Sequence, residues 1–369
     1  MPYDPCEEST VTPETRELLR ELSEAFGIPG SEDEVRAIMA RHLAPFAEIS
    51  YDRLGCIIAR REGRAAAPRI MLPAHMDEIG LIVRHITDQG FLKFVPRGFW
   101  SQVLPAQRWV VRTHKGDRIA VTGVKAPHLL TEEERNKPIP TKDMYLDIGA
   151  RSRDEAIEMG VRPGDPAAPW GPVADLGNGR LLGKAWDDRA GCVMVIEVMR
   201  ELAKRDHPNT VFGVGTIQEE SGLRGARTSS VAVDPDVALV AEITCANDVP
   251  GSTQDGSYSE LGKGPAICLY DAQMVPTARL RDFVCRVAEE ISMPIQFTSM
   301  EGGTTDGTFV QVHGKGVPTL YLGPATRYVH SHIGTMDEAD FDQTIQLLIE
   351  TIVRLDESAV SRLVDFGQP

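Results

Sequence analysis

The chain carries five short motifs in which an apolar run ends at a residue type that binds metal ions. The residues in question are His75 and Asp77 in PAHMDE, Asp187 and Asp188 in KAWDDR, Glu219 and Glu220 in TIQEES, Glu242 in VALVAEIT, and His330 in TRYVHS. Ligands from such distant segments can meet only in a folded chain. Three of the preceding runs, 70–72, 211–217 and 237–240, are apolar enough to be buried strands, and open α/β sheets bind ligands at the carboxyl ends of their strands. The pattern therefore predicts an α/β fold with a site at one sheet edge.

Length and composition are typical of a soluble protein. With 369 residues, the chain exceeds the roughly 250 to 300 residues at which a single core stops growing, so one domain with an insertion fits well. No apolar stretch approaches the roughly 20 residues that a membrane span needs. The first residues, MPYDPCEESTVTPETR, lack the basic start and apolar core of a secretory signal. We therefore expect a cytoplasmic protein without a membrane partner.

The charge and the cysteines exclude two further classes. The net charge is −15, and the acidic residues are spread along the chain, so no basic stripe is present to bind the phosphates of a nucleic acid. The six cysteines show no CxxC spacing, which favours a reducing compartment over a disulfide framework.

The order of predicted elements indicates an α/β domain that is interrupted by an insertion. Helical periodicity covers residues 14–26 and 31–44, where Ser31 and Glu34 have the spacing of a capping box. From residue 80 to about 181, short β-like pieces alternate with Gly and Pro. Beyond residue 188, helices and strands alternate again, which is typical of a mostly parallel sheet covered by helices.

These patterns predict the domain boundaries. Residues 1–79 and 182–369 are expected to form one catalytic domain, and residues 80–181 an inserted, β-rich domain. Within the insertion, residues 131–140 (TEEERNKPIP) are the best candidate for a mobile loop.

The five candidate ligands His75, Asp187, Glu220, Glu242 and His330 supply the nitrogen and oxygen donors that suit Zn²⁺, Co²⁺ or Mn²⁺. Five exceed the three protein ligands of a usual catalytic zinc site. A shared carboxylate explains the surplus: Asp187 between two ions, His75 and Glu242 on one, and Glu220 and His330 on the other, with the ions ~3.5 to ~4 Å apart. A water between two such ions would ionise near neutral pH and could attack an amide.

Two further acids have predicted supporting roles. Glu219 and Glu220 are adjacent, so both cannot comfortably bind the same ion, and the free carboxylate could act as general base and acid. Asp77 is placed to accept the other N–H of the His75 imidazole and so fix its tautomer.

The motifs HMDE, AWDDRAG, QEESGLRGA and TRYVHS, together with GFLKF, APHLL, YLDIGARSRDEA and GGTTDG, resemble the dinuclear-metal aminopeptidases that assemble into tetrahedral dodecamers, a family of glutamyl, leucyl, lysyl and deblocking enzymes. The match runs from about residue 14 to residue 355. The resemblance implies a zinc-aminopeptidase-like fold and two divalent metal ions per subunit. It also implies His75, Asp187, Glu220, Glu242 and His330 as ligands, Glu219 as base, Asp77 as the partner of His75, and a cis peptide between Asp187 and Asp188.

The resemblance further implies cleavage of N-terminal residues from short peptides by a homo-oligomer, in which the insertion builds dimers that assemble into a dodecamer. Two positions depart from the family pattern. Glu242 stands where the family usually has Asp, and His332 stands where it typically has Pro, so His332 could compete for metal or contact substrate. Asp306, in GGTTDGT, could help hold the free amine of the substrate.

Simpler structural interpretations exist for several of these residues. Asp187 and Asp188 could cap the helix that follows them, and His75 or His330 taken alone could be a hydrogen-bonded structural histidine. Glu242 lies within an apolar run, where a carboxylate is seldom buried unless it is paired or bound to metal.

Other functions share parts of this pattern. A dinuclear carboxypeptidase or deacylase would use the same metal centre. An endoglucanase-type glycoside hydrolase needs two carboxyl groups facing each other ~5 to ~9.5 Å apart across a sugar, which the neighbouring Glu219 and Glu220 do not suggest. A silent assembly subunit that drifted at Glu242 is a further alternative. The metal-dependent aminopeptidase remains the leading hypothesis.

Overall fold

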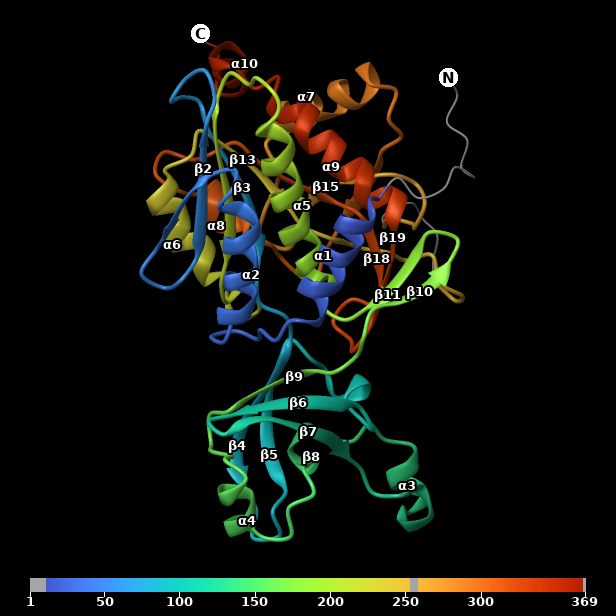
Figure 1. Cartoon of the computed structure of the whole chain (residues 1–369). Helices are drawn as coiled ribbons and strands as arrows, with labels where there is room; N and C mark the ends of the chain where they lie inside the picture. Colours follow the sequence, from blue (N-terminus) through green and yellow to red (C-terminus); the bar gives the residue numbers. More distant parts are fainter. Residues whose placement is uncertain (1–10, 253–257, 368–369) are drawn as a thin grey trace.

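The computed structural model describes residues 11–252 and 258–367, and shows an α/β body joined through a narrow waist to a β-barrel (Figure 1). An eight-stranded sheet runs through the body in the order β1-β2-β12-β3-β13-β17-β15-β16. Its strands are β1 (Glu48–Tyr51), β2 (Ile57–Glu62), β3 (Arg69–His75), β12 (Thr210–Thr216), β13 (Val237–Ala241), β15 (Ala266–Tyr270), β16 (Gln296–Ser299) and β17 (Thr319–Gly323).

The centre of the sheet is parallel. Strands β12, β3, β13 and β17 are neighbours and run in one direction, whereas β1, β2 and β12 pair antiparallel, as do β15 and β17. The register places Thr216 of β12 opposite His75 of β3. The prediction of a mostly parallel sheet is therefore confirmed for the strands that carry the candidate ligands, and their carboxyl ends share one edge.

Alternating side chains of the buried strands face two helical layers. Ile70 and Leu72 belong to the large core with the first layer, whereas Met71 belongs to a separate core with the second. The first layer contains α1 (Pro13–Glu24), α2 (Asp33–Leu43), α5 (Trp186–Leu202), α7 (Ala278–Glu290) and α9 (Glu338–Ile352), and the second contains α6 (Arg224–Val233) and α8 (Gly307–Gln311). A further helix, α10 (Glu357–Leu363), follows α9. A strand with apolar residues on both sides needs such cover.

The start of α2 differs from the prediction. Ser31 does not cap it: the N-cap is Glu32, and no side chain makes a capping hydrogen bond there. The helix therefore begins one residue later than predicted. Ser31 belongs to the preceding turn, in which Gly30 has φ +85° and the Ser31 N–H donates to the carbonyl of Ile28. The Glu32 carboxylate instead accepts N–H groups from Gly30 and Gln218, which ties this turn to the segment after β12.

Six strands of the insertion close into a barrel in the order β4-β5-β8-β7-β6-β9. They are β4 (Gly80–Ile86), β5 (Leu92–Arg97), β6 (Arg108–Thr113), β7 (Gly116–Gly123), β8 (Tyr145–Asp147) and β9 (Pro166–Pro169), and the barrel has its own apolar core. Between β7 and β8, in the segment expected to be mobile, α3 (Glu132–Arg135) has a capping box made by Thr131 and Glu134. Short helical turns lie at Ser101–Val103, Pro127–Leu129 and Thr141–Asp143, and α4 (Arg153–Glu158) precedes β9.

A second sheet of the body has the order β10-β11-β19-β18-β14. Its strands are β10 (Ala174–Gly177), β11 (Arg180–Gly183), β14 (Thr244–Cys245), β18 (Ala325–Arg327) and β19 (Gly334–Asp337). Because β11 pairs with β19 rather than with the barrel, we propose that the inserted domain ends near residue 170 instead of residue 181. Sequence patterns missed this sheet because its strands are two to four residues long.

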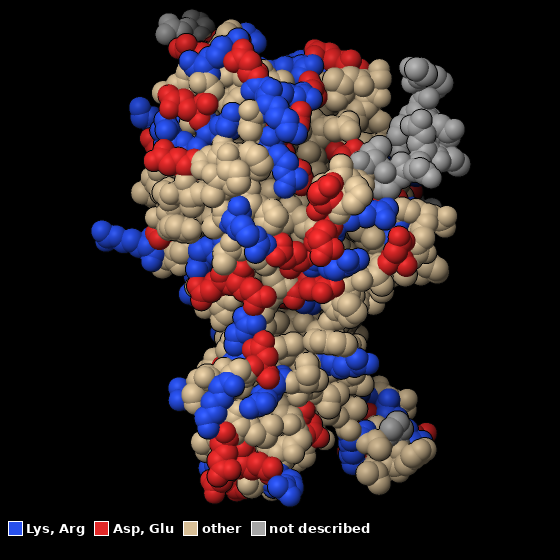
Figure 2. Space-filling model, viewed as in Figure 1, with Lys and Arg blue, Asp and Glu red and all other residues tan. Residues whose placement is uncertain are grey.

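The surface charge, the helices and the cysteines bear on whether the chain has features of other protein classes. Figure 2 shows basic and acidic side chains intermixed over one face, without a continuous basic band. Within residues 11–252 and 258–367, no helix combines the length and apolar character that crossing a membrane requires. The five cysteines in these ranges are free thiols, and Cys6 lies outside them.

Candidate active site

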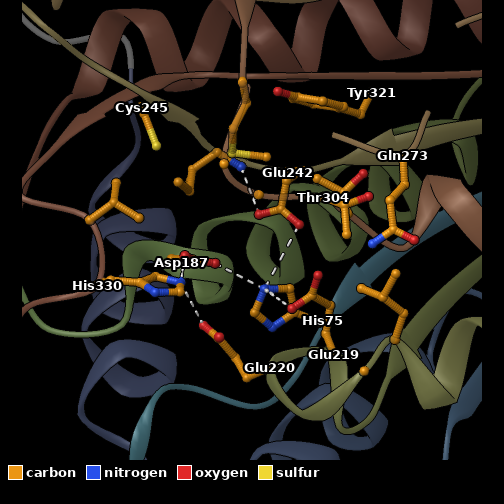
Figure 3. A pocket seen from close by; sticks show the side chains of 18 of the residues that line it. His75, Asp187, Glu219, Glu220, Glu242, Cys245, Gln273, Thr304, Tyr321 and His330 are labelled. Carbon is orange, nitrogen blue, oxygen red and sulfur yellow. Dashed lines mark hydrogen bonds and ion pairs between the residues drawn. The ribbon is translucent and has the colours of Figure 1, made fainter. Parts of the chain in front are cut away.

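The candidate ligands lie at the carboxyl edge of the parallel strands (Figure 3). His75 is the last residue of β3, Glu242 directly follows β13, and Glu220 lies in the turn Glu219–Ser221 after β12. Asp187 is at the start of α5, where its backbone is not helical. His330 comes from the loop between β18 and β19. Five segments that are far apart in the sequence therefore converge on one point.

Asp187 lies between the two imidazoles. Its Oδ1 is 2.9 Å from His75 Nε2, and its Oδ2 is 3.4 Å from His330 Nε2. Each imidazole also faces a second carboxylate: His75 Nε2 is 3.8 Å from Glu242 Oε2, and His330 Nε2 is 3.1 Å from Glu220 Oε1. The structure therefore brings the five predicted residues together, with Asp187 between the two imidazoles.

Burial of so many acids perturbs their protonation. Burial raises the pKa values of Glu219 and Glu242 well above the ordinary range. Burial acts in the opposite direction on His330, but hydrogen bonds with Asp187 and Glu220 raise the pKa of this imidazole to about 11. His75 responds similarly: Glu242, Glu219 and Asp187 outweigh burial and raise its pKa well above the usual value. The acidic cluster thus favours the protonated, positively charged forms of both imidazoles.

The donor set fits divalent cations. Ligand atoms of His75, Asp187 and Glu220 lie within 4.8 Å of one another, and so do those of His75, Asp188 and Glu242. Asp187, Glu219, Glu220 and Glu242 line a cavity with the two histidines, so two divalent cations would balance these four carboxylates. Mixed imidazole and carboxylate donors suit Zn²⁺, Co²⁺ or Mn²⁺.

Asp188 is better placed to position the site than to bind a metal ion. Its Oδ2 accepts the backbone N–H of His75, and its Oδ1 accepts that of Gly191. Both carboxylate oxygens are therefore already engaged, and the side chain is fully buried. The peptide bond between Asp187 and Asp188 is cis, as the resemblance implied.

Asp77 supports the site differently from the prediction. The His75 Nδ1–H donates to the backbone carbonyl of Asp77 at 2.8 Å, whereas the Asp77 carboxylate oxygen is 3.7 Å away. The carboxylate instead accepts the backbone N–H groups of Glu219 and Glu220, at 2.9 and 3.1 Å. Asp77 thus accepts the N–H of His75 through its backbone carbonyl, which leaves its carboxylate to the two glutamates. Asp77 thereby links the His75 segment to the two glutamates.

Glu219 and Glu220 point in different directions, as their adjacency predicts (Figure 3). Glu219 Oε2 is 4.0 Å from His75 Nε2, whereas Glu220 faces His330. Glu219 also lines the cavity, so its carboxylate can meet a molecule that binds there.

The cavity beside the cluster has a volume of about 590 Å³. Its remaining walls are uncharged, and the sequence analysis assigned a role to none of them: Gly222, Leu223, Ile243, Cys245, Gln273, Met300, Gly302, Gly303, Thr304, Thr305, Phe309, Tyr321 and Val329. Figure 3 shows Gln273, Thr304 and Tyr321 on the side of Glu242. They come from separate loops and β17, and only Thr304 lies within a quoted motif, GGTTDG.

The two candidate substrate-binding residues lie outside the cavity lining. Asp306 is buried, and its Oδ2 accepts the hydroxyl hydrogen of Thr216. His332 is packed against the barrel, with Nε2 donating to the carbonyl of Arg108 at 2.7 Å. Burial lowers the pKa of His332 to about 4, so this ring is neutral. These placements argue against substrate contact by either residue and against His332 as a competing metal ligand.

A mostly parallel α/β sheet with imidazoles and carboxylates gathered at its carboxyl edge defines a metal-dependent hydrolase. The chain belongs to the M42 glutamyl aminopeptidase family, whose model matches residues 55–347. It is 35% identical to a lysyl aminopeptidase of Pyrococcus furiosus over 348 residues, which cover 92% of this chain and 98% of that protein. The chain is thus a metal-dependent aminopeptidase.

Solved structures agree with this assignment. A TET aminopeptidase from a marine sediment Thaumarchaeota archaeon matches with a TM-score of 0.93 and 42% identity, over 96% of this chain and 100% of that one. A TET1 peptidase of Pyrococcus horikoshii, which can assemble into a tetrahedron or a large octahedral shell, matches with a TM-score of 0.84 and 31% identity, over 92% and 100%.

Proposed function

We propose that the catalytic centre holds two divalent cations, with Asp187 shared between them. His75 and Glu242 would complete one position, and Glu220 and His330 the other. The contacts of Asp187 with both imidazoles support this division. When bound, such a pair of Zn²⁺, Co²⁺ or Mn²⁺ ions supplies Lewis-acid activation of water and of the scissile carbonyl.

Glu219 is proposed to move the proton. Its carboxylate lines the cavity, and burial raises its pKa, which brings it closer to the operating pH that favours a general base. It would take a proton from the attacking water and pass it to the leaving amine. Asp77 holds the Glu219 backbone N–H and so fixes the start of that side chain.

The walls of the cavity support a preference for N-terminal residues with uncharged side chains. Beyond the ligand cluster, the described lining includes Leu223, Met300, Phe309 and Gln273, and it has no Lys, Arg, Asp or Glu. A glutamyl or lysyl side chain placed there would lose its hydration without gaining an ion-pair partner. The substrates would be short peptides that begin with residues such as leucine or methionine.

We also propose that the chain forms a homo-oligomer, with the barrel as the dimerisation domain and a dodecamer as the final assembly. The support is the similarity to the TET1 peptidase of Pyrococcus horikoshii. Light scattering of the purified protein tests this part independently of activity.

The central experiment measures hydrolysis of leucyl-, methionyl-, glutamyl- and lysyl-nitroanilides before and after chelation. We expect chelation to abolish activity and Zn²⁺ or Co²⁺ to restore it. The kcat/KM for leucyl or methionyl substrates should exceed that for glutamyl or lysyl substrates by about tenfold or more. Activity that survives complete metal removal would overturn the metal assignment, whereas a best glutamyl or lysyl substrate would overturn only the preference.

The alternatives are tested with the same preparation. Cleavage of N-blocked peptides from the carboxyl end, without cleavage of free N-termini, would indicate a carboxypeptidase or deacylase. Chelator-insensitive release of sugar from cellulose would indicate a glycoside hydrolase.

A further inference from the structure

His330 differs from the other candidate ligands in how it is held. The others belong to a strand end, a helix start or the turn that directly follows a strand, whereas His330 lies in the exposed loop 328–333, with Tyr328 52% and Ile333 46% exposed. His330 itself has a positive φ of 59°. A non-glycine residue in this conformation needs surrounding contacts to hold it.

The barrel provides a contact on the far side of the His330 ring. His330 Nδ1 donates to the carbonyl of Gly98 at 3.0 Å, which directs Nε2 toward Glu220 and Asp187. Gly98 follows β5, and a Cβ built on it would be 3.0 Å from Glu220 Oε2. One turn of the barrel therefore touches both residues proposed to bind the second cation. A hydrogen bond to the outer nitrogen fixes the tautomer and direction of a ligating imidazole.

The same loop is anchored in the barrel two residues later. The His332 ring is 6% exposed and lies edge-on to Trp109, with the ring centroids 4.3 Å apart, and it also packs near Phe99. Its Nε2 donates to the Arg108 carbonyl, which also accepts the N–H of Trp170 after β9. Trp109 and Phe99 belong to the apolar core of the barrel. His332 thus inserts the ligand loop into a rigid part of another domain.

We propose that His332 is a positioning residue: it fixes loop 328–333 to the barrel so that the Gly98 carbonyl can orient His330. The inserted barrel would then help to build the catalytic centre in addition to its proposed role in assembly. This inference rests on the proposed metal positions. The inference predicts a selective effect. Loosening the loop should weaken metal binding at the Glu220–His330 position. The His75–Glu242 position should stay intact, because β3 and β13 hold its ligands.

The test compares three substitutions with one control. His332→Ala removes the ring and the donor, His332→Phe keeps a ring without the donor, and His332→Gln keeps a donor without the ring. Leu146→Ala is the control, because Leu146 is buried in the same barrel core on β8 and is not a partner of His332. It weakens the barrel core without removing a residue that His332 contacts.

Two measurements on the full-length protein decide the outcome. The first is hydrogen exchange in the metal-free protein, followed in peptides that cover residues 97–100 and 328–334. Exchange there should become faster in His332→Ala and His332→Phe, and less so in His332→Gln. It should stay unchanged in Leu146→Ala. After dialysis against limiting Zn²⁺, the wild type should retain two equivalents and His332→Ala about one. The affinity for the second equivalent should fall by roughly tenfold or more, and excess Zn²⁺ should restore most activity.

Unchanged exchange in the loop together with two wild-type equivalents in His332→Phe and His332→Gln would overturn the proposal, even if His332→Ala fails to fold. Equal loss of both equivalents, or the same result for Leu146→Ala, would also overturn it, because the effect would then be general destabilisation. A wild type that binds fewer than two ions would instead contradict the proposed dinuclear centre, and the exchange measurement would still decide whether His332 holds the loop.

Discussion

Glu219 and Glu220 are neighbours, yet they face different partners, and this divergence allows two roles in one dipeptide. Glu220 contacts His330, whereas Glu219 lines the cavity near His75. The backbone of both residues is held by Asp77. A substitution at Glu219 should therefore affect proton transfer without removing a ligand.

We expect Glu219→Gln to keep both metal equivalents and lower kcat by about 10² to 10⁴, because an amide cannot accept the proton of water. Metal analysis and nitroanilide kinetics check this result. Glu220→Gln is the matched control, and it should lose metal as well as activity. If Glu219→Gln lost metal and activity in parallel, Glu219 would be a ligand rather than the base.

Metal binding should release protons. In the metal-free protein, Asp187 and Glu220 raise the pKa of His330 to about 11, so the ring is protonated at neutral pH and must lose that proton to bind metal. Apparent affinity for Zn²⁺ should therefore rise with pH from about 6 to 9. Calorimetry in two buffers of different ionisation enthalpy measures the release, and identical binding enthalpies in both buffers would contradict it.

At the scale of elements, the site depends on the close approach of α5 to the end of β13. Gly191 of α5 makes this approach feasible, because a Cβ at this position would be 2.3 Å from the carbonyl oxygen of Ala241 and 2.3 Å from the Asp188 carboxylate. Ala241 immediately precedes Glu242. The glycine at position 191 therefore helps to set the distance between two proposed metal ligands, Asp187 and Glu242.

Gly191→Ala should force α5 away from β13, lower the free energy of unfolding by about 1 to 3 kcal/mol, and weaken metal binding. Denaturant unfolding and metal analysis measure the two effects. Gly171→Ala is the control, because nothing lies within 4 Å of a Cβ built there. Wild-type stability of Gly191→Ala would show that the two elements can separate without cost.

For the whole molecule, metal binding joins segments that the chain connects only over long distances. The proposed ligands come from β3, α5, the turn after β12, the end of β13 and the loop after β18. Removing cations leaves Asp187, Glu219, Glu220 and Glu242 together around one cavity. The metal-free protein instead holds protons on this cluster, because the pKa values of His75, His330, Glu219 and Glu242 are raised, and it lacks the ligand bonds that would join the five segments.

Chelation should therefore lower the melting temperature by several degrees, since a cation at about 1,000 times its Kd stabilises the native state by about 4 kcal/mol. Calorimetry before chelation, after chelation and after addition of Zn²⁺ measures the change. Mg²⁺ at the same concentration is a useful control, because it prefers oxygen ligands. An unchanged melting temperature after verified metal removal would contradict a stabilising role.

Sequence patterns were sufficient to indicate which residues could carry the chemistry and which segments form the parallel strands. Apolar runs that end at His75, Glu220 and Glu242 place these residues at strand ends, because strand burial and chain direction are local properties. The surplus of ligands suggested the pairing around Asp187, and the family resemblance implied the same five ligands. Local patterns also indicated a β-rich insertion.

The way in which distant segments meet could be seen only in the folded chain. The fold assigned the Asp77 carbonyl to His75 and the Asp77 carboxylate to the two glutamates, brought uncharged residues such as Gln273 and Thr304 into the cavity wall, and placed His332 against Trp109 of the barrel. Apart from the His75–Asp77 pair, these contacts join segments that lie far apart in the sequence. Hydrogen-bond acceptors and cavity walls depend on packing between elements, which local periodicity does not encode.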